Sequence, residues 1–127
     1  MQPQKTFEDL RVYEDAINLT IQIYTLLKKR QFKTEFGLSD QLRRATLSIS
    51  NNIAEGFERE TDKELIRYLY FAKGSAGEVR NILNVIKAIE FINEDEYQEL
   101  RGKVIDISKQ LSNYIKYVVK RDFEKGK

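Results

Sequence analysis

Three observations predict that this chain is all-α and folds as an antiparallel up-down-up-down four-helix bundle. Apolar residues recur at alternating steps of three and four along four separate stretches, which is the spacing of one face of an α-helix. Short connections join these stretches, so consecutive helices are expected to run antiparallel. The single proline, Pro3, precedes all four stretches and therefore breaks none of them. We expect one domain over residues 1–127, with helices at about 10–29, 39–59, 62–89 and 94–122.

The first predicted helix carries two apolar rows. One row is Leu10, Tyr13, Ile17, Thr20, Tyr24 and Leu27, and the other is Val12, Ala16, Leu19, Ile23 and Leu26. Together they form a face wider than one neighbouring helix can cover. Two interpretations stay open: the helix is buried between two neighbours of its own bundle, or it gives one row to a second subunit. In the connection that follows, we expect Phe32 and Phe36 to fold back over the end of the core.

The second predicted helix has a narrow apolar face of small residues and a polar stripe on the opposite side. Ser39 is its expected N-cap, followed by Asp40 in the first turn. The stripe consists of Arg44, Ser48, Asn51 and Glu55, with Gln41, Asn52 and Arg59 along its edge. Because charged and amide side chains alternate along it, the stripe predicts a specific hydrogen-bonded contact. Near the end of the helix, we expect Gly56 either to loosen the last turn or to allow a close contact.

The third and fourth predicted helices both begin with capping sequences. Thr61 and Glu64 have the spacing of a capping box, and the segment 93–96 repeats this arrangement at the start of the fourth helix. Gly74 and Gly77 lie in the middle of the third helix, where each costs about 1 kcal/mol relative to alanine. We interpret this pair as a device for close backbone approach or a slight bend, rather than as a ligand-binding loop.

Counting outwards from the turn between the second and third helices predicts which of their residues come level with one another. Charged residues of opposite sign meet at two levels in this register. We therefore predict these polar pairings: Arg43 or Arg44 with Glu78, and Glu55 with Arg67. Partly buried pairs of this kind fix the register of two helices more reliably than they stabilise them.

The composition excludes most enzyme chemistry. The chain has no cysteine and no histidine, which removes thiol nucleophiles, imidazole bases and the ligands that zinc prefers. It also argues against a di-iron bundle, since such bundles use Glu-x-x-His ligand sets. Glu55 and Glu78 remain available for carboxylate acid–base chemistry, but structural ion pairs explain them better. We expect a non-enzyme with no cofactor, no metal and no small-molecule substrate.

Location and partner class follow from charge and hydropathy. The N-terminus lacks the apolar core of a signal peptide, and no apolar run approaches the ~18 residues of a membrane span. We therefore expect a cytoplasmic protein without a membrane partner. The formal net charge of +2 is too small to imply nucleic-acid binding by itself, so only a local cluster of basic residues would favour it.

Basic residues do gather at both ends of the expected bundle. At one end, the first connection approaches the start of the second helix and brings together the candidate nucleic-acid-binding residues Lys28, Lys29, Arg30, Lys33, Arg43 and Arg44. At the other end, Arg59, Lys63 and Arg67 are expected to meet Lys116, Lys120 and Arg121. The chain's tyrosines and phenylalanines add potential stacking surfaces. Against nucleic-acid binding, acidic residues are interleaved almost everywhere and most aromatic residues fall on core-facing rows. Basic residues that only solubilise the surface remain the alternative.

A specific motif is spread over three segments of the chain: GLSDQLRRA at 37–45, SISNNIAEG at 48–56 and LYFAKGSAGE at 69–78. With the opening FEDLRVYEDA at 7–16 and the pair Ile23-Tyr24, these segments resemble the 23S rRNA intervening-sequence proteins, a bacterial four-helix-bundle family. The matching positions are Arg43, Arg44, Asn51, Asn52, Glu55, Gly56, Ser75 and Glu78. Their polar members, together with Arg67, form the expected polar network. Gly77 departs from the pattern, because a larger apolar residue or alanine is expected there.

The resemblance implies an up-down-up-down bundle that assembles into a homopentamer, with the second apolar row of the first helix as a candidate contact. It also implies a link with ribosomal RNA, since members are often encoded within insertions in large-subunit rRNA genes. A distant branch serves as an accessory protein to a reverse transcriptase. We therefore expect a non-enzymatic homo-oligomer that binds ribosomal RNA or acts as a nucleoprotein-associated scaffold. The alternative is a protein–protein interaction module with no nucleic-acid role.

Overall fold

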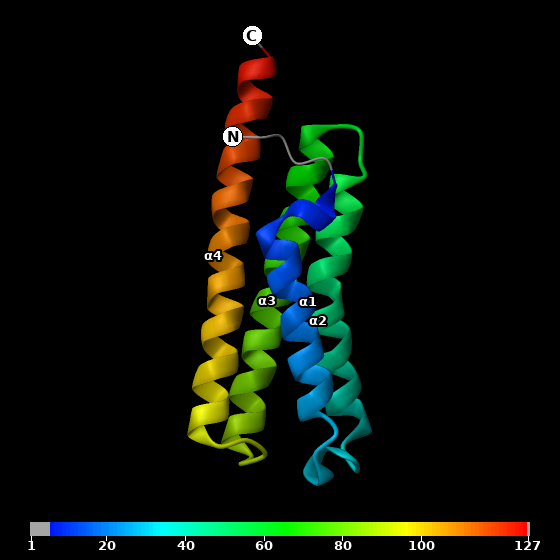
Figure 1. Ribbon diagram of the computed structural model, residues 1–127, viewed down its shortest axis with the longest axis vertical. Coiled ribbons are helices and arrows are strands. Elements are labelled where there is room, and N and C mark those ends of the chain that lie inside the picture. Colours follow the sequence, from blue (N-terminus) through cyan, green and yellow to red (C-terminus); the bar gives the residue numbers. More distant parts are fainter. Residues whose placement is uncertain (1–5, 127) are drawn as a thin grey trace.

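Four long helices form an antiparallel bundle in the computed structural model, which describes residues 6–126 (Figure 1). The elements are α1 (Arg11–Leu26), α2 (Phe36–Phe57), α3 (Asp62–Ala88) and α4 (Glu94–Lys125), with two short 3-10 turns, η1 (Phe7–Asp9) and η2 (Arg30–Phe32). Around the bundle, α2 packs against α1 and α3, and α4 packs against α3 and α1. Consecutive helices run in opposite directions, so the predicted all-α four-helix bundle is confirmed.

The first connection differs from the prediction in its bounds and in one of its aromatic residues. α1 ends before Lys28 and Lys29, which lie in the connection, and α2 already begins at Phe36. Ser39 is therefore not an N-cap but a buried residue of α2, whose Oγ donates to the carbonyl oxygen of Phe32 at 3.2 Å. Phe32 is buried as predicted, whereas Phe36 is 80% exposed because it heads the helix and points away from the core.

The cap at the start of α4 is a complete capping box, whereas at the start of α3 only the Thr61 half of the predicted capping box forms. The Thr61 side chain accepts a hydrogen bond from the backbone N–H of Glu64 at 3.2 Å. At the start of α4, the Asn93 side chain accepts from the N–H of Glu96 at 2.8 Å, and the Glu96 carboxylate accepts from the N–H of Asn93 at 3.1 Å. This reciprocal pair is a complete capping box, so α4 begins at the predicted residue.

The C-terminal end of α4 extends beyond its predicted end at residue 122 and rises past the turn between α2 and α3 (Figure 1). Arg121 donates to the Asp62 carboxylate through Nε at 3.1 Å and through Nη2 at 2.7 Å. The Nζ of Lys125 lies 3.1 Å from the same carboxylate, whose side chain is only 9% exposed. These contacts tie the last turns of α4 to the start of α3, which explains why the helix continues.

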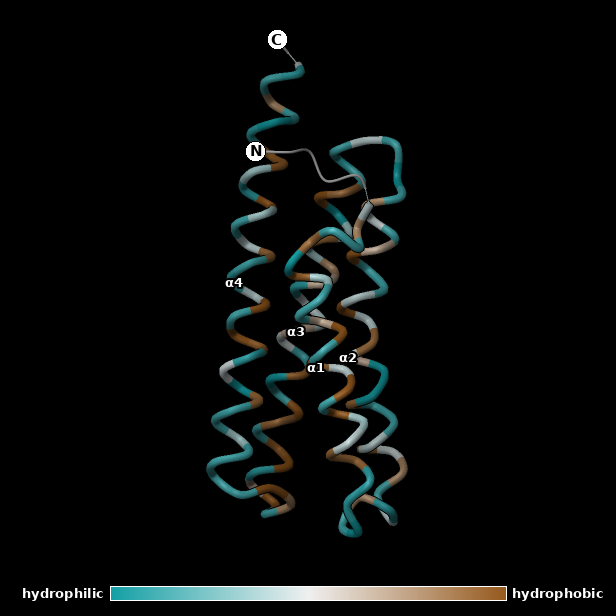
Figure 2. The backbone as a smooth tube through the Cα atoms, in the orientation of Figure 1, coloured by the Kyte–Doolittle hydropathy of each residue, from teal (hydrophilic) through white to brown (hydrophobic). Residues whose placement is uncertain are grey.

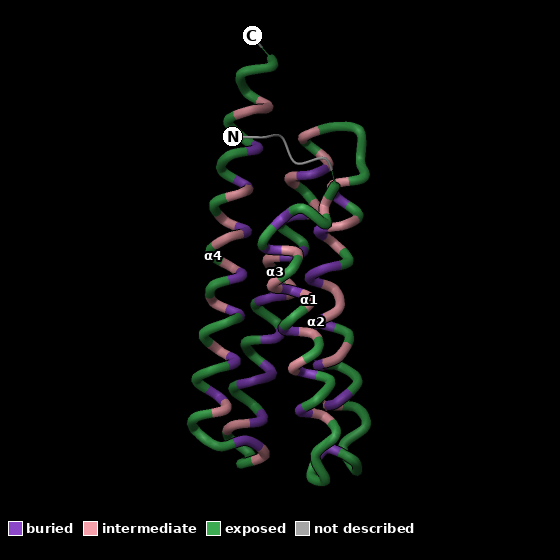
Figure 3. Tube along the Cα trace, in the orientation of Figure 1, coloured by how far each residue is buried: buried purple, intermediate pink, exposed green. Residues whose placement is uncertain are grey.

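An apolar seam runs along the bundle axis between the four helices, and the outer faces are polar (Figures 2 and 3). In α1, the buried row is the second one, Val12, Ala16, Leu19, Ile23 and Leu26. Because it packs inside a single bundle, the prediction that this row contacts another subunit is wrong. The other row is covered less well, and of its members only Leu10 is buried. On this outer side Tyr24 is 40% exposed, and the adjacent Ile21 is 58% exposed. Within one subunit, α1 therefore keeps apolar surface that faces away from the core.

Gly56 differs from Gly74 and Gly77 in how closely other atoms surround it. A Cβ at Gly56 would lie 2.6 Å from the Cβ of Tyr68, so this glycine allows α2 to approach α3 closely, as one of the two predictions for it stated. Gly74 and Gly77 do not mediate close approach, because a Cβ at either position would meet no atom within 4 Å. The helix α3 runs through both positions without interruption. The interpretation of this glycine pair as a device for close backbone approach is therefore wrong, and the alternative of a slight bend stays a prediction.

Candidate functional site

The predicted basic residues of the first connection lie together at one end of the bundle. Lys28, Arg30 and Lys33 are exposed there, and none of the three forms an ion pair within residues 6–126. Lys29 differs from them, because its ammonium pairs with the carboxylate of Glu96 at the start of α4. The hydrogen bond from Lys29 lowers the pKa of the Glu96 carboxyl. Three of the four basic residues of the connection thus have no carboxylate partner within residues 6–126.

Arg43 and Arg44 do not pair with Glu78, so this predicted pairing is wrong. Arg43 Nη1 lies 3.7 Å and Arg44 Nε lies 3.8 Å from the carboxylate of Asp40. Asp40 stands one turn earlier on the same helix, where it is reached without crossing the helix interface. Arg43 also lies over the ring of Tyr24, with the guanidinium carbon 5.8 Å from its centroid. Glu78 does come level with Arg44, since both line a shallow hollow between α2 and α3.

The predicted pairing of Glu55 with Arg67 is wrong for the same reason. Glu55 accepts from Nη2 of Arg59 at 2.9 Å, one turn away on α2. The same nitrogen donates to the Tyr68 hydroxyl at 2.7 Å, and the guanidinium carbon lies 4.9 Å from the centroid of that ring. Arg67 lies 3.6 Å from Glu64 on its own helix. Each charge finds a partner at helical spacing, which leaves no ion pair across this part of the interface.

Hydroxyl and amide groups, rather than charges, join the motif residues of α2 and α3. Ser75 Oγ donates to Ser48 Oγ at 2.9 Å. Asn52 Nδ2 donates to the same hydroxyl at 2.9 Å and to the Ser48 carbonyl oxygen at 2.8 Å. Asn51 is exposed and forms no side-chain hydrogen bond in the described part of the chain. The α2–α3 contact therefore contains a specific hydrogen-bonded cluster that is smaller than the predicted network.

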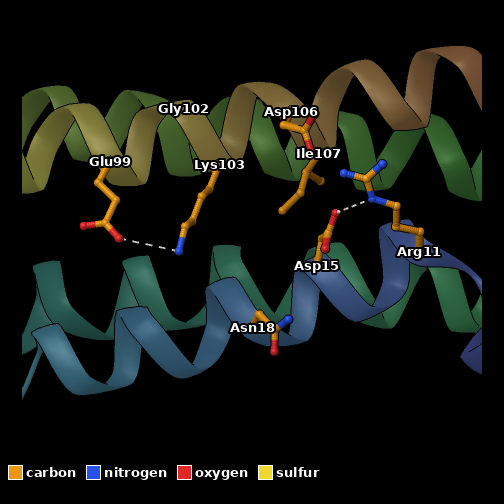
Figure 4. Close-up of a pocket in the computed structure, with 8 residues that line it drawn as sticks. All are labelled: Arg11, Asp15, Asn18, Glu99, Gly102, Lys103, Asp106 and Ile107. Atoms are coloured by element: carbon orange, nitrogen blue, oxygen red, sulfur yellow. Dashed lines mark ion pairs between the residues drawn. The ribbon is translucent and has the colours of Figure 1, made fainter.

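A groove of about 420 Å³ lies between α1 and α4 (Figure 4). Charges of both signs line it and pair at one-turn spacing: Arg11 Nε is 3.6 Å from Asp15, and Lys103 Nζ is 3.6 Å from Glu99. Gln110 bridges the two helices by donating to Asp15 at 2.7 Å and to Asp106 at 2.8 Å. The charged side chains that line this groove therefore already have partners close by within the protein.

A second groove, of about 480 Å³, lies on the other side of α4, between α4 and α3. Its charged lining residues are all cationic: Lys73, Arg80, Lys109 and Lys116. Sequence analysis missed this cluster because the two pairs belong to segments far apart in the chain. The available signal was the seven-residue spacing within each pair, which places both members on one stripe of their helix.

The carboxylates considered for acid–base chemistry do not form a site. Glu55 and Glu78 are both exposed and lie on different helices, and Glu55 is paired with Arg59. In residues 6–126, no three acidic side chains converge as a metal site would require. None of the helices in the same range is long and apolar enough to cross a membrane.

Comparison with known proteins gives a family and a structural relative. A family model described as 23S rRNA-intervening sequence protein matches residues 8–113. A solved structure from Bacteroides thetaiotaomicron, described as a protein with unknown function from the S23 ribosomal protein family, is similar at a TM-score of 0.77 and 27% identity. The similarity covers 83% of this chain and 98% of that chain. No curated protein matches the sequence. Neither description names an enzymatic activity.

Proposed function

Since the chain belongs to the 23S rRNA-intervening sequence protein family, we propose that it is a non-enzymatic, homo-oligomeric bundle that binds structured RNA. Ribosomal RNA is the first candidate, and the bundle would act as a scaffold in a nucleoprotein. The observation that carries this proposal is the group formed by Lys28, Arg30 and Lys33, exposed on one connection and without ion pairs in the described chain. Uncompensated cations on a nearly neutral protein create a local positive potential that phosphates neutralise. With such a partner, the expected location is the cytoplasm.

The apolar surface of α1 supports self-association. Ile21 is 58% exposed and Tyr24 is 40% exposed on the outer side of α1, where Arg43 of α2 lies over the Tyr24 ring. A second copy of the chain would remove this surface from water, and the pentamer implied by the family resemblance is the assembly that we propose.

A filter-binding titration tests the RNA part of the proposal. Structured fragments of large-subunit rRNA are titrated with the protein over a series of salt concentrations. We expect binding that weakens steeply with salt, and a Lys28→Gln/Arg30→Gln/Lys33→Gln variant whose salt slope is lower by about 2 to 3. The control variant Arg59→Gln/Lys87→Gln/Lys103→Gln also removes three positive charges, but from residues that already have carboxylate partners. Its RNA affinity and salt slope should stay closer to those of the wild type.

Light scattering tests the assembly part. We expect a species several times heavier than the 15.0 kDa chain at micromolar concentration, and Ile21→Gln should shift it towards the monomer. Val85→Gln on α3 is the matched control, because Val85 is 41% exposed on a different face. A wild-type protein that scatters only as a 15.0 kDa species refutes self-association.

The second candidate function is a protein-interaction module without a nucleic-acid role. The same exposed side of α1 favours it, because apolar surface fits a protein partner better than it fits phosphate. Absence of RNA binding at low salt, with an intact fold by circular dichroism, would leave this candidate standing alone.

A further inference from the structure

We propose that the groove between α3 and α4 is a binding site for the phosphate backbone of RNA, separate from the basic connection. This inference rests on the proposed function, because it names a second surface through which the same class of partner is held. Four cations line the groove: Lys73 and Arg80 from α3, and Lys109 and Lys116 from α4. The other lining residues are uncharged, so no carboxylate contributes to the lining within residues 6–126.

The four cations are uncompensated. In the part of the chain that the structure describes, none of them forms an ion pair, although most other basic side chains along α3 and α4 do: Arg67, Lys87, Lys103, Arg121 and Lys125. Like charges around one hollow repel one another and raise its positive potential. An anion that enters the groove relieves this repulsion, and it does so without breaking any existing contact.

The spacing of the cations favours a polyanion over a single phosphate. Lys73 and Arg80 are separated by seven residues, as are Lys109 and Lys116, which corresponds to about 10.5 Å along each helix axis. Successive phosphates of one strand would let each cation of such a pair contact a phosphate of its own, whereas a single phosphate would require the two like charges to converge. Ser108, Ser112 and Asn113 line the groove between the cations and offer hydrogen bonds to phosphate or ribose oxygens.

Gly77 does not line the groove itself but stands beside it, on the same stripe of α3 as two of its cations. It lies between Lys73 and Arg80 on one stripe of α3, and a Cβ there would meet no atom within 4 Å. The packing of the bundle therefore does not require glycine, and glycine destabilises a helix interior relative to alanine. Any longer side chain at this position would project from between the two cations. The packing of the bundle does not explain why a side chain is missing here. An RNA strand lying along the stripe would explain it.

RNA fits this surface better than a membrane or an acidic protein segment does. The groove is concave and carries a hydroxyl and amide lining, whereas binding at a lipid surface uses a convex or flat face with apolar side chains to insert. The single apolar lining residue is Ile105. An acidic peptide would match the same charge, but its other side chains would find only one apolar residue in the groove to pack against.

The test compares variants of the full-length protein in RNA titrations over a salt series, using structured large-subunit rRNA fragments. Lys73→Gln/Lys109→Gln should weaken binding about tenfold or more at low salt and reduce the salt slope by about 2. Gly77→Glu should weaken binding more than its uncharged isostere Gly77→Gln, because it places a carboxylate between Lys73 and Arg80 on the same stripe of α3. Circular dichroism and thermal unfolding confirm that each variant folds, and Gly77→Gln should be at least as stable as the wild type.

The outcomes separate this inference from the proposed function. A wild-type protein that does not bind RNA at low salt overturns both. Wild-type binding that is lost with Lys28→Gln/Arg30→Gln/Lys33→Gln but unchanged in every groove variant overturns the groove alone. Binding of the wild type to phosphatidylserine vesicles or to a poly-glutamate peptide as tightly as to RNA, with the same groove dependence, overturns the assignment of the partner as RNA.

Discussion

The two grooves beside α4 are similar in volume, about 420 and 480 Å³, but opposite in electrostatic character. The α1–α4 groove is lined by three carboxylates and two cations, a formal charge of −1, and the α3–α4 groove by four cations, a formal charge of +4. In the first groove, charges of opposite sign lie one turn apart and neutralise each other. In the second, charges of the same sign recur every seven residues. The net charge of +2 for the whole chain therefore conceals a strongly positive surface.

Charge reversal in the cationic groove is expected to have the largest effect. Lys109→Glu/Lys116→Glu would give the α3–α4 groove the mixed charge of its counterpart, and we expect RNA affinity to fall by about 100-fold or more at low salt. Filter binding measures the change. The matched control is Arg11→Glu/Lys103→Glu in the α1–α4 groove, which changes the net charge equally and should reduce affinity much less. Equal losses in both variants would mean that overall charge, and not the groove, governs binding.

Substitution of Gly56 and of Gly77 compares a packed position between α2 and α3 with an open position on the surface of α3. Gly56→Ala should destabilise the protein by about 1–3 kcal/mol, because the new Cβ collides with Tyr68 and forces α2 away from α3. Gly77→Ala should instead stabilise it by up to about 1 kcal/mol, since its Cβ enters open space in a helix. Chemical denaturation of both variants gives the two changes. Destabilisation by Gly77→Ala would show that α3 needs this glycine for packing.

Asp62 shows what a carboxylate does where α3 and α4 meet outside the groove. Asp62→Asn leaves Arg121 and Lys125 without their shared carboxylate, so we expect a loss of about 1–2 kcal/mol and fraying of the last turns of α4. The hydrogen bond from Arg121 lowers the pKa of the Asp62 carboxyl below its ordinary value of 3.8. The stabilisation is therefore present above that value and is lost as the pH falls through the lowered pKa. Thermal unfolding should separate the two proteins at neutral pH and bring them together in strong acid.

The smallest effect is expected in the charge-compensated groove. Asp15→Asn breaks the pair with Arg11, whose side chain is 78% exposed, so stability should change by about 0.5 kcal/mol or less. The new amide oxygen still accepts from Gln110. RNA affinity should change by less than about twofold, because this groove already neutralises its own charges. A tenfold gain in affinity would show that Asp15 shields a binding surface on this side as well.

The sequence predicted the fold because the relevant information is local. The period of apolar residues identified all four helices, and the buried residues of α4 recur at steps of three and four as that period requires. The caps at Thr61 and Asn93 were predictable because a cap involves residues three positions apart. The start of α2 was not, because Ser39 bonds to the carbonyl oxygen of Phe32 in the preceding turn instead of capping the helix.

The candidate site was predicted less well, because a charged side chain can pair with any of several oppositely charged neighbours. Simple counting put Glu78 at the level of Arg44, yet both arginines of the motif pair with Asp40 on their own helix. For these two arginines the partner at helical spacing prevails, since that pair needs no fit between two helices.

By itself, the sequence determined that the chain forms four amphipathic helices in an antiparallel bundle, and that histidine and cysteine chemistry is absent. Those properties depend on composition and on spacing within one helix. Only the tertiary structure decided that Lys73 and Arg80 line one groove with Lys109 and Lys116, and that this groove contains no carboxylate. That arrangement depends on the rotation of α3 and α4 about their axes, which is fixed by how their apolar seams pack together.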